Sequence, residues 1–348
     1  MDEVLSAYDF PMNNVAIEQI DNGLINSTWR IKNGDQNFIL QKVNHHIFKN
    51  PGAIASNIRL IANYLQKHFP EYFFVSLVTT KDEEEMVQIK DNGYFRLIPF
   101  VKNSHTIDTV AEPQQAFEAA KKFGEFTKLL SHFPVEKLQI TLPDFHNLSL
   151  RYQQFLEALK TGNQNRLIES KELIEFIKAH QNIVEIYENI LHNPAFKLRV
   201  THHDTKISNV LFNKENKGLC VIDLDTVMPG YFISDVGDMI RTYVSPVNEE
   251  EKDFSKISIR NEYFKSIWDG YMGQMKNELN EEEKSHFIYA GKFMIYMQAI
   301  RFLTDHLNND IYYGARYEGQ NFVRAGNQIT LLQRLMEKEQ SLKKLIEQ

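Results

Sequence analysis

The chain has 348 residues, of which 43% are hydrophobic and 24% charged, and this composition excludes a disordered, collagenous or membrane-embedded protein. A globular chain of this length buries about three quarters of its surface and typically divides into two domains. The formal charge of −7 disfavours general attraction to nucleic acid or to an anionic membrane, so an anionic ligand would need a locally positive pocket.

The N-terminal third alternates short β-favouring stretches with Asn-Gly turns, which predicts an antiparallel sheet. One helix with apolar residues at helical spacing, 53–68, interrupts the strands. The expected strands are Ser27 to Ile31, Asn37 to Val43, Tyr72 to Val78, Glu85 to Ile89 and Tyr94 to Phe100. We therefore expect a small β-rich lobe over residues 1–101.

Beyond Pro99 the hydrophobic period changes to 3.6 residues, which predicts a larger, mainly helical lobe over residues 102–348. The expected helices cover 116–133, 150–159, 170–190, 261–276, 281–306 and 325–346. One compact β-rich passage, 198–233, lies between them. The predicted fold class is α+β.

That β-rich passage carries the chemistry. Two short strands, Val210 to Phe212 and Leu219 to Ile222, form a predicted hairpin, with Asp204 before it and Asp223 after it. Because a hairpin brings its ends together, Asp204, Asn209 and Asp223 are expected to face one cavity. Carboxylate and amide oxygens suit a hard cation such as Mg²⁺, and phosphoryl transfer needs such a set.

The residues His202, Asp204, Lys206 and Asn209 form the pattern H-x-D-x-K-x-x-N, which resembles the catalytic loop of protein kinases. Asp223-Leu224-Asp225 stands where those enzymes have D-F-G, so the chain looks like the aminoglycoside and choline phosphotransferase-like branch. The wider strings RVTHHDTKISNVLF, IDLDTVMPG, GLINSTWRI, RFLTDHL and DIYYGARY resemble bacterial N-acetylhexosamine 1-kinases over nearly the whole chain.

This resemblance implies a two-lobe protein-kinase-like fold and transfer of the ATP γ-phosphate to the anomeric hydroxyl of N-acetylglucosamine or N-acetylgalactosamine. It makes Asp204 the general base and Lys206 a stabiliser of phosphate charge. The expected Mg²⁺ ligands are Asn209 and Asp223, while Asp225 has a metal, sugar-binding or turn-forming role. Asp235 and Asp238 would support the loop.

The same resemblance implies a phosphate-covering loop that includes Gly23, Asn26, Ser27 and Thr28. Adenine would hydrogen-bond to the backbone of the segment between the lobes, and because Pro99 lacks an N–H, Phe100 or Val101 is the expected donor.

Strand 37–43 departs from the protein-kinase pattern. Gln41 stands at the expected lysine position, and Lys42 is predicted on the opposite strand face. Helix 53–68 contains no Glu or Asp, which is consistent with a kinase lacking the lysine–glutamate ion pair. Gln41 and Lys42 both remain candidates for nucleotide binding.

The resemblance assigns Arg301 and Tyr312 to the hexosamine. The alternative is that Arg301 merely pairs with Asp305 on a solvated helix face. Alternative functions are a kinase for choline, homoserine, methylthioribose or an aminoglycoside, and a pseudokinase that only binds sugar or nucleotide. A single cysteine, Cys220, and the absence of a signal-like start lead us to expect a cytoplasmic monomer or weak homodimer that binds small molecules and neither nucleic acid nor membrane.

Overall fold

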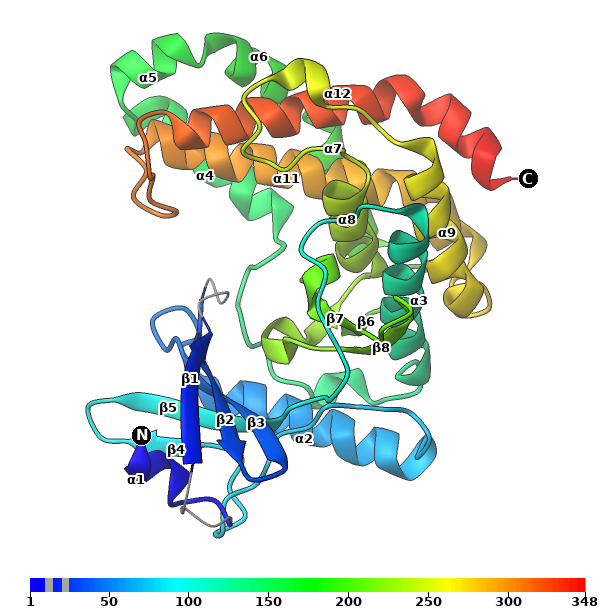
Figure 1. Cartoon of the computed structure of the whole chain (residues 1–348). Coiled ribbons are helices and arrows are strands. Elements are labelled where there is room, and N and C mark those ends of the chain that lie inside the picture. The colour runs from blue at the N-terminus through cyan, green and yellow to red at the C-terminus, as the bar shows by residue number, and fades with distance from the viewer. Residues whose placement is uncertain (10–14, 21–24, 348) are drawn as a thin grey trace.

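The computed structural model describes residues 1–9, 15–20 and 25–347. A small antiparallel sheet lies at one end and a helical part at the other (Figure 1), which confirms the predicted α+β, protein-kinase-like class. The first part contains α1 (Asp2–Leu5), β1 (Val15–Ile20), β2 (Ser27–Asn33), β3 (Gln36–Val43), α2 (Pro51–His68), β4 (Val87–Ile89) and β5 (Gly93–Pro99).

The sheet has the strand order β1-β2-β3-β5-β4. Its outer face packs on α1 in a small core made of Val4, Leu5, Tyr8, Ile31, Leu40, Phe95 and Leu97. The predicted strand 72–78 is wrong, because only Val78 pairs there, in an isolated bridge to Leu97. At the opposite edge of the sheet lies β1, a strand that the turn signals did not indicate.

Helix α2 begins at Pro51, whose fixed φ suits the first helical position, after Asn50 caps the backbone N–H of Ala53. Its apolar side chains, including Ile54 and Ile58, belong to the large core of the helical part. The two parts of the chain therefore share a core beneath α2.

Helices make up most of the second part. They are α3 (Pro113–Leu129), α4 (Leu148–Thr161), α5 (Gln164–Glu169), α6 (Lys171–Ala179), α7 (Asn182–His192), α8 (Phe232–Tyr243), α9 (Asn261–Met275), α10 (Glu281–Ser285), α11 (Phe287–Leu307) and α12 (Gln320–Ile346). The helices expected over 170–190 and 281–306 are each two helices. Helix α11 is mostly buried and lies at the centre of the core, where α4, α8 and α12 pack around it.

The β-rich passage lies between the sheet and the helices (Figure 1). It consists of β6 (Arg199–Thr201), β7 (Val210–Phe212), β8 (Gly218–Val221) and β9 (Met228–Gly230), with β7 paired to β8 and β6 to β9. Cys220 is buried on β8. The proposed boundary between the two lobes, at residue 101, falls between β5 and α3.

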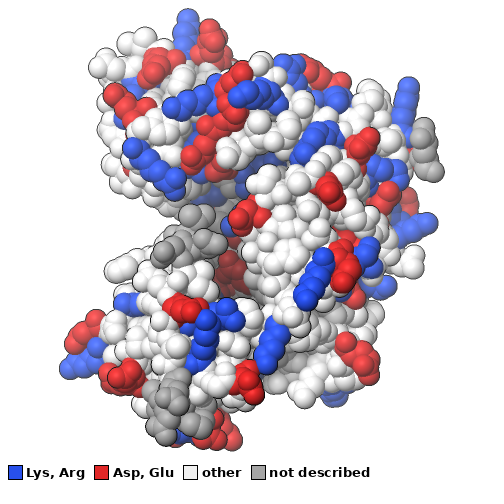
Figure 2. Space-filling model, in the orientation of Figure 1, with Lys and Arg blue, Asp and Glu red and all other residues white. Residues whose placement is uncertain are grey.

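A hollow separates the two parts on the face shown in Figure 2, and acidic side chains are visible inside it. None of the described helices is long and apolar enough to cross a membrane.

Candidate active site

The β7–β8 hairpin places Asn209 beside Asp223. Val210 pairs with Val221, and the backbone N–H of Ile222 donates to the carbonyl oxygen of Asn209 at 2.9 Å, which extends the ladder by one step. The residues at the two ends of the hairpin therefore lie side by side, as the sequence predicts.

Asp204 and Lys206 occupy the loop before the hairpin. Lys206 Nζ lies 3.1 Å from Asp204 Oδ2, and both side chains are partly exposed to solvent. The amide nitrogen of Asn209 donates to the carbonyl oxygen of Asp204 at 2.9 Å. This bond links the proposed base to the proposed metal ligand and orients the Asn209 amide.

Asp235, on α8, holds this loop from beneath. Its buried carboxylate accepts the backbone N–H groups of His202 at 3.1 Å and His203 at 2.7 Å. Burial raises the pKa of Asp235 to about 7, while the two N–H donors act in the opposite direction. The predicted supporting role of Asp235 is confirmed by these hydrogen bonds.

Thr205 is held at each of its polar groups. Its backbone N–H donates to Asp238 Oδ2 at 2.9 Å, and its hydroxyl donates to the carbonyl oxygen of Asp235 at 2.8 Å. The hydroxyl of Tyr243 donates to the Thr205 carbonyl oxygen at 2.5 Å. The residue between Asp204 and Lys206 is therefore immobilised against α8, and the predicted support by Asp238 is confirmed.

His202 packs below the loop. Its ring stands edge-on to Phe123 and contacts the carbonyl oxygen of Ile222 through Nε2 at 2.9 Å. The hydroxyl of Thr226 donates to the His202 carbonyl oxygen at 2.7 Å. His202 thus connects the loop with the segments that flank Asp223.

The electrostatics of the loop follow from crowded carboxylates. Asp223 is accessible to water, yet the protein around it, together with the charges of Asp225 and Asp204, raises its pKa to about 7. Burial would lower the pKa of Lys206, but the neighbouring carboxylates, with Asp204 foremost, outweigh it and raise the pKa. Lys206 therefore stays charged. The carboxylates around it attract cations to the site.

The oxygen donors fit Mg²⁺. Mg²⁺ in kinases is held by one or two protein oxygens together with phosphates and waters. Asn209 and Asp223 can supply an amide oxygen and a carboxylate, and within the described residues no three His, Cys, Asp or Glu side chains gather as a self-sufficient metal cage. The donor set suits a metal that arrives with a nucleotide.

The sheet contributes its inner face to the cleft. Gln41 lies opposite Arg96 and Thr28 in the strand register, so the three share one face. Gln41 Nε2 donates to Thr28 Oγ1 at 3.4 Å. Lys42 lies on the other face, where its Nζ donates to Asn92 Oδ1 at 2.8 Å.

Arg96, which the motifs did not single out, links the sheet to the segment that follows β8. It is only 1% exposed, and its Nη1 forms an ion pair with Asp225 Oδ1. Asp225 Oδ2 also accepts from Asn26 Nδ2 at 2.8 Å, and Asn26 Oδ1 accepts the backbone N–H of Asn44 at 2.9 Å. Asp225 is therefore bound by two side chains of the other lobe.

The other predicted nucleotide-binding residues are placed as follows. Gly23 lies outside the described residues, and Ser27 is exposed at the start of β2. The backbone N–H of Phe100 donates to the carbonyl oxygen of Asn37 at 3.0 Å, so this group is already used within the sheet. Val101 is the remaining candidate for the adenine.

A contact between α2 and the helical part was also not indicated by the sequence motifs. Asn57, fully buried on α2, donates from Nδ2 to the carbonyl oxygens of Gln139 and Val227, at 2.8 and 3.0 Å. Its Oδ1 accepts the backbone N–H of Gln139 at 2.9 Å. This amide fastens α2, which contains no acidic residue, directly to the segment that follows Asp225.

Arg301, on α11, lies among aromatic rings rather than in an ion pair. Its guanidinium lies 5.3 Å from the ring centre of Tyr313 and 5.9 Å from those of Tyr312 and Phe145. Asp305 is buried and accepts the backbone N–H groups of Tyr312 and Tyr313 at 2.7 and 2.9 Å. The alternative of an exposed Arg301–Asp305 pair is therefore wrong.

His146 and His203 form a pair next to this arginine. Their rings stand edge-to-face with centres 5.2 Å apart, and the two Nδ1 atoms are 3.4 Å apart. Burial lowers the pKa of His203 to about 4. It also lowers the pKa of His146 well below the usual range, with further lowering from His203 and Arg301. Both rings are neutral at pH 7.

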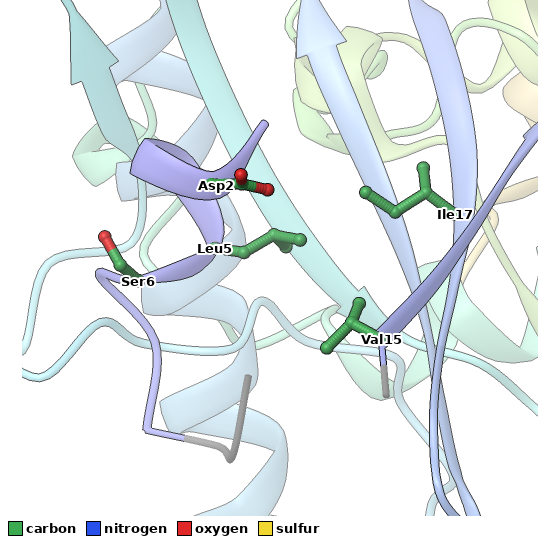
Figure 3. Close-up of a pocket in the computed structure, with 5 residues that line it drawn as sticks. All are labelled: Asp2, Leu5, Ser6, Val15 and Ile17. Carbon is green, nitrogen blue, oxygen red and sulfur yellow. The ribbon is translucent and has the colours of Figure 1, made fainter. Parts of the chain in front are cut away.

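The hollow in Figure 3 lies elsewhere, between α1 and β1. It is lined by Asp2, Leu5, Ser6, Val15 and Ile17, none of which is among the predicted site residues.

The fold is shared with several solved small-molecule kinases. A microcompartment-associated aminopropanol kinase matches at a TM-score of 0.68 and 13% identity, over 97% of this chain and 96% of its own. An aminoglycoside phosphotransferase from Alicyclobacillus acidocaldarius matches at 0.65 and 13%, over 99% and 96% of the two chains. A choline kinase from Cryptosporidium parvum matches at 0.55 and 13%, over 96% and 93%.

The model of one protein family, described as the phosphotransferase enzyme family, matches residues 16–254, which is more than half of the sequence and includes the loop with Asp204 and Lys206 and the β7–β8 hairpin. The chain belongs to the phosphotransferase enzyme family.

Proposed function

We propose that the protein is an ATP-dependent kinase that phosphorylates the anomeric hydroxyl of N-acetylhexosamines. The observation that carries the proposal is the pairing of Asp204 with Lys206 at 3.1 Å beside Asn209 and Asp223. These are the side chains that phosphoryl transfer requires, and membership of the phosphotransferase family supports their use.

In the proposed reaction, Asp204 accepts the proton of the anomeric hydroxyl as its oxygen forms a bond to the γ-phosphorus. The bond between the γ-phosphorus and the β–γ bridging oxygen breaks, and ADP leaves. Lys206 stabilises the charge on the transferred phosphoryl group. Asn209 and Asp223 would hold Mg²⁺, which supplies neutralisation of the phosphate charge when bound.

The wall around Arg301 supports an uncharged acceptor. Arg301 and Arg151 bring positive charge to it, and His146 and His203 stay neutral through burial. A guanidinium and a phenol, here that of Tyr312, donate directed hydrogen bonds to hydroxyl and acetamido oxygens. A polycationic acceptor would be repelled by the arginines.

We further propose that the enzyme works in the cytoplasm, as a monomer or weak homodimer. The buried thiol of Cys220, the one cysteine in the sequence, is consistent with a reducing compartment.

The test is incubation with Mg-ATP and a panel of acceptors, with phosphorus NMR to locate the new phosphate. The panel contains N-acetylglucosamine, N-acetylgalactosamine, the methyl glycosides of both, choline, homoserine, methylthioribose and an aminoglycoside. We expect turnover of the two free sugars only, with phosphate on C1. The methyl glycosides lack the anomeric hydroxyl, so their phosphorylation, or turnover of choline alone, would overturn the proposal.

The variant Asp204→Asn tests the proposed general base, because it replaces the carboxylate with an amide of the same size. We expect its turnover to fall by about 100-fold or more, because a general base contributes a factor of that size. Mg-ADP binding and the melting temperature should stay near the wild-type values. Substantial residual turnover would show that Asp204 is not the base.

A further inference from the structure

The cleft face of the sheet lacks the lysine that protein kinases use to hold the nucleotide phosphates. Gln41 occupies the cleft face of β3, and Lys42 points to the opposite face, where it lies over the ring of Phe95 at 5.8 Å. A nucleotide beneath this sheet would therefore need another cation from the sheet.

Arg96 is placed to be that cation. It stands on β5, directly opposite Gln41, on the cleft face. Gln41 Oε1 accepts from both Nε, at 3.0 Å, and Nη2, at 2.7 Å, of the guanidinium. These two bonds occupy one side of the planar fork and turn Nη1 toward the other lobe, where it meets Asp225.

The Arg96–Asp225 pair is buried between two lobes, with side-chain exposures of 2% and 3%. A buried charge needs a partner of opposite sign, since an unpaired one is strongly destabilising. Asp225 follows the proposed metal ligand Asp223 by two residues, so this pair lies where the phosphates of a metal-bound nucleotide would lie. The carboxylate gives Arg96 Nη1 an anionic oxygen acceptor, and a phosphate oxygen can form the same charge-assisted contact.

We propose that Arg96 is the cationic ligand of the nucleotide phosphates, in place of the strand lysine, and that Asp225 is its partner only until the nucleotide arrives. Phosphate oxygens then replace the Asp225 carboxylate at Nη1, while Gln41 continues to orient the guanidinium. The inference rests on the proposed ATP-dependent function.

The first test compares nucleotide affinities by calorimetry, with Mg²⁺ present. In Arg96→Gln we expect the affinity for ADP to fall about 10- to 100-fold, the usual range for a lost charge-assisted bond, while adenosine affinity stays within about twofold. Arg96→Lys should restore part of the difference. Arg59→Gln, which removes an exposed arginine of α2 that pairs with Glu85, is the charge control and should bind ADP as the wild type does.

Because Arg96→Gln leaves Asp225 unpaired, the double variant Arg96→Gln/Asp225→Asn keeps the site neutral. Circular dichroism and melting temperatures verify that each variant is folded.

The second test is done without metal, in EDTA, so that a metal role of Asp225 cannot contribute. Asp225→Asn frees Arg96, so we expect this variant to bind ADP at least about threefold more tightly than the wild type does. Adding Asp225→Asn to Arg96→Gln should bring no such gain, so the double variant should bind ADP as Arg96→Gln does. If Arg96→Gln binds ADP as tightly as the wild type does, or if the gain persists in the double variant, the inference is overturned. If the wild type itself binds no adenine nucleotide, the proposed function fails as well.

Discussion

Asp235 and His203 are joined by a hydrogen bond of 2.7 Å from the backbone N–H of His203 to the Asp235 carboxylate. His203 adopts a left-handed backbone conformation with φ of 65°, which a residue with a side chain adopts at a cost. The carboxylate stabilises this conformation, and the next residue is the proposed base, Asp204. The position of the base therefore depends on α8.

We expect Asp235→Asn to lower kcat by about 10- to 100-fold, because displacing a catalytic group by about 1 Å has effects of that size. The amide can accept only one of the two backbone N–H groups and presents its own N–H to the other. ADP affinity should change little. Asp269→Asn, which removes a half-exposed carboxylate paired with Lys265 on α9, is the matched control. Unchanged kcat in Asp235→Asn would contradict the role of this residue in placing the loop.

Lys42→Ala addresses the strand lysine directly. The Lys42 ammonium contacts Asn92 and lies on the face of β3 away from the cleft. We expect the KM for ATP to stay within about twofold and the free energy of unfolding to change by less than about 0.5 kcal/mol, as for a surface residue. Steady-state kinetics at varied ATP measure this. A collapse of kcat/KM would make Lys42 the phosphate ligand instead.

The hairpin of the candidate site could be predicted because its signals are local. Asp204, Asn209 and Asp223 lie within 20 positions, and one hairpin with a polar turn brings them together. The same holds for the support of the loop, since Asp235 lies in the first turn of the helix that follows, α8. Short-range periodicity and turn chemistry determine both.

Arg96 and His146 could not be predicted in this way. Arg96 acquires its role from the register that sets it opposite Gln41, 55 positions away, and from Asp225 in the other lobe. His146 meets His203 only through tertiary packing. The strand expected over 72–78 failed for a related reason: β propensity was present, but only Val78 pairs with β5, at Leu97, while β4 pairs with residues 93–95 of that strand.

The His203 ring predicts a pH dependence of stability. Its pKa is about 4 in the folded protein and about 6.5 in the unfolded chain, so between these values protons bind to the unfolded state. This contribution is fully present above pH 6.5 and is lost as the pH falls toward 4, amounting to about 3 kcal/mol.

His203→Asn removes this titration, and asparagine tolerates a positive φ. We therefore expect the difference in free energy of unfolding between wild type and variant to shrink steadily from pH 7 to pH 4.5. Urea denaturation at several pH values measures it. A difference that is independent of pH would show that His203 titrates normally.

A buried ion pair between β6 and α10 offers a test of the fold. Arg199 on β6 and Glu283 on α10 form a bidentate ion pair, with Nη1–Oε1 at 2.5 Å and Nη2–Oε2 at 3.0 Å. Glu283 is fully buried. Glu283 also accepts the backbone N–H of Asn280 at 3.1 Å, so it joins the helix start to the β6 strand.

We expect Glu283→Gln to lower the free energy of unfolding by about 3–5 kcal/mol, because Arg199 is left as a buried charge without a counterion. Glu281→Gln, in the same turn but 90% exposed, should change it by less than about 0.5 kcal/mol. In the double variant Arg199→Met/Glu283→Leu no charge remains buried, so most of the lost stability should return. If the double variant is no more stable than Glu283→Gln, the loss comes from the capping and packing roles of Glu283 rather than from the unpaired arginine.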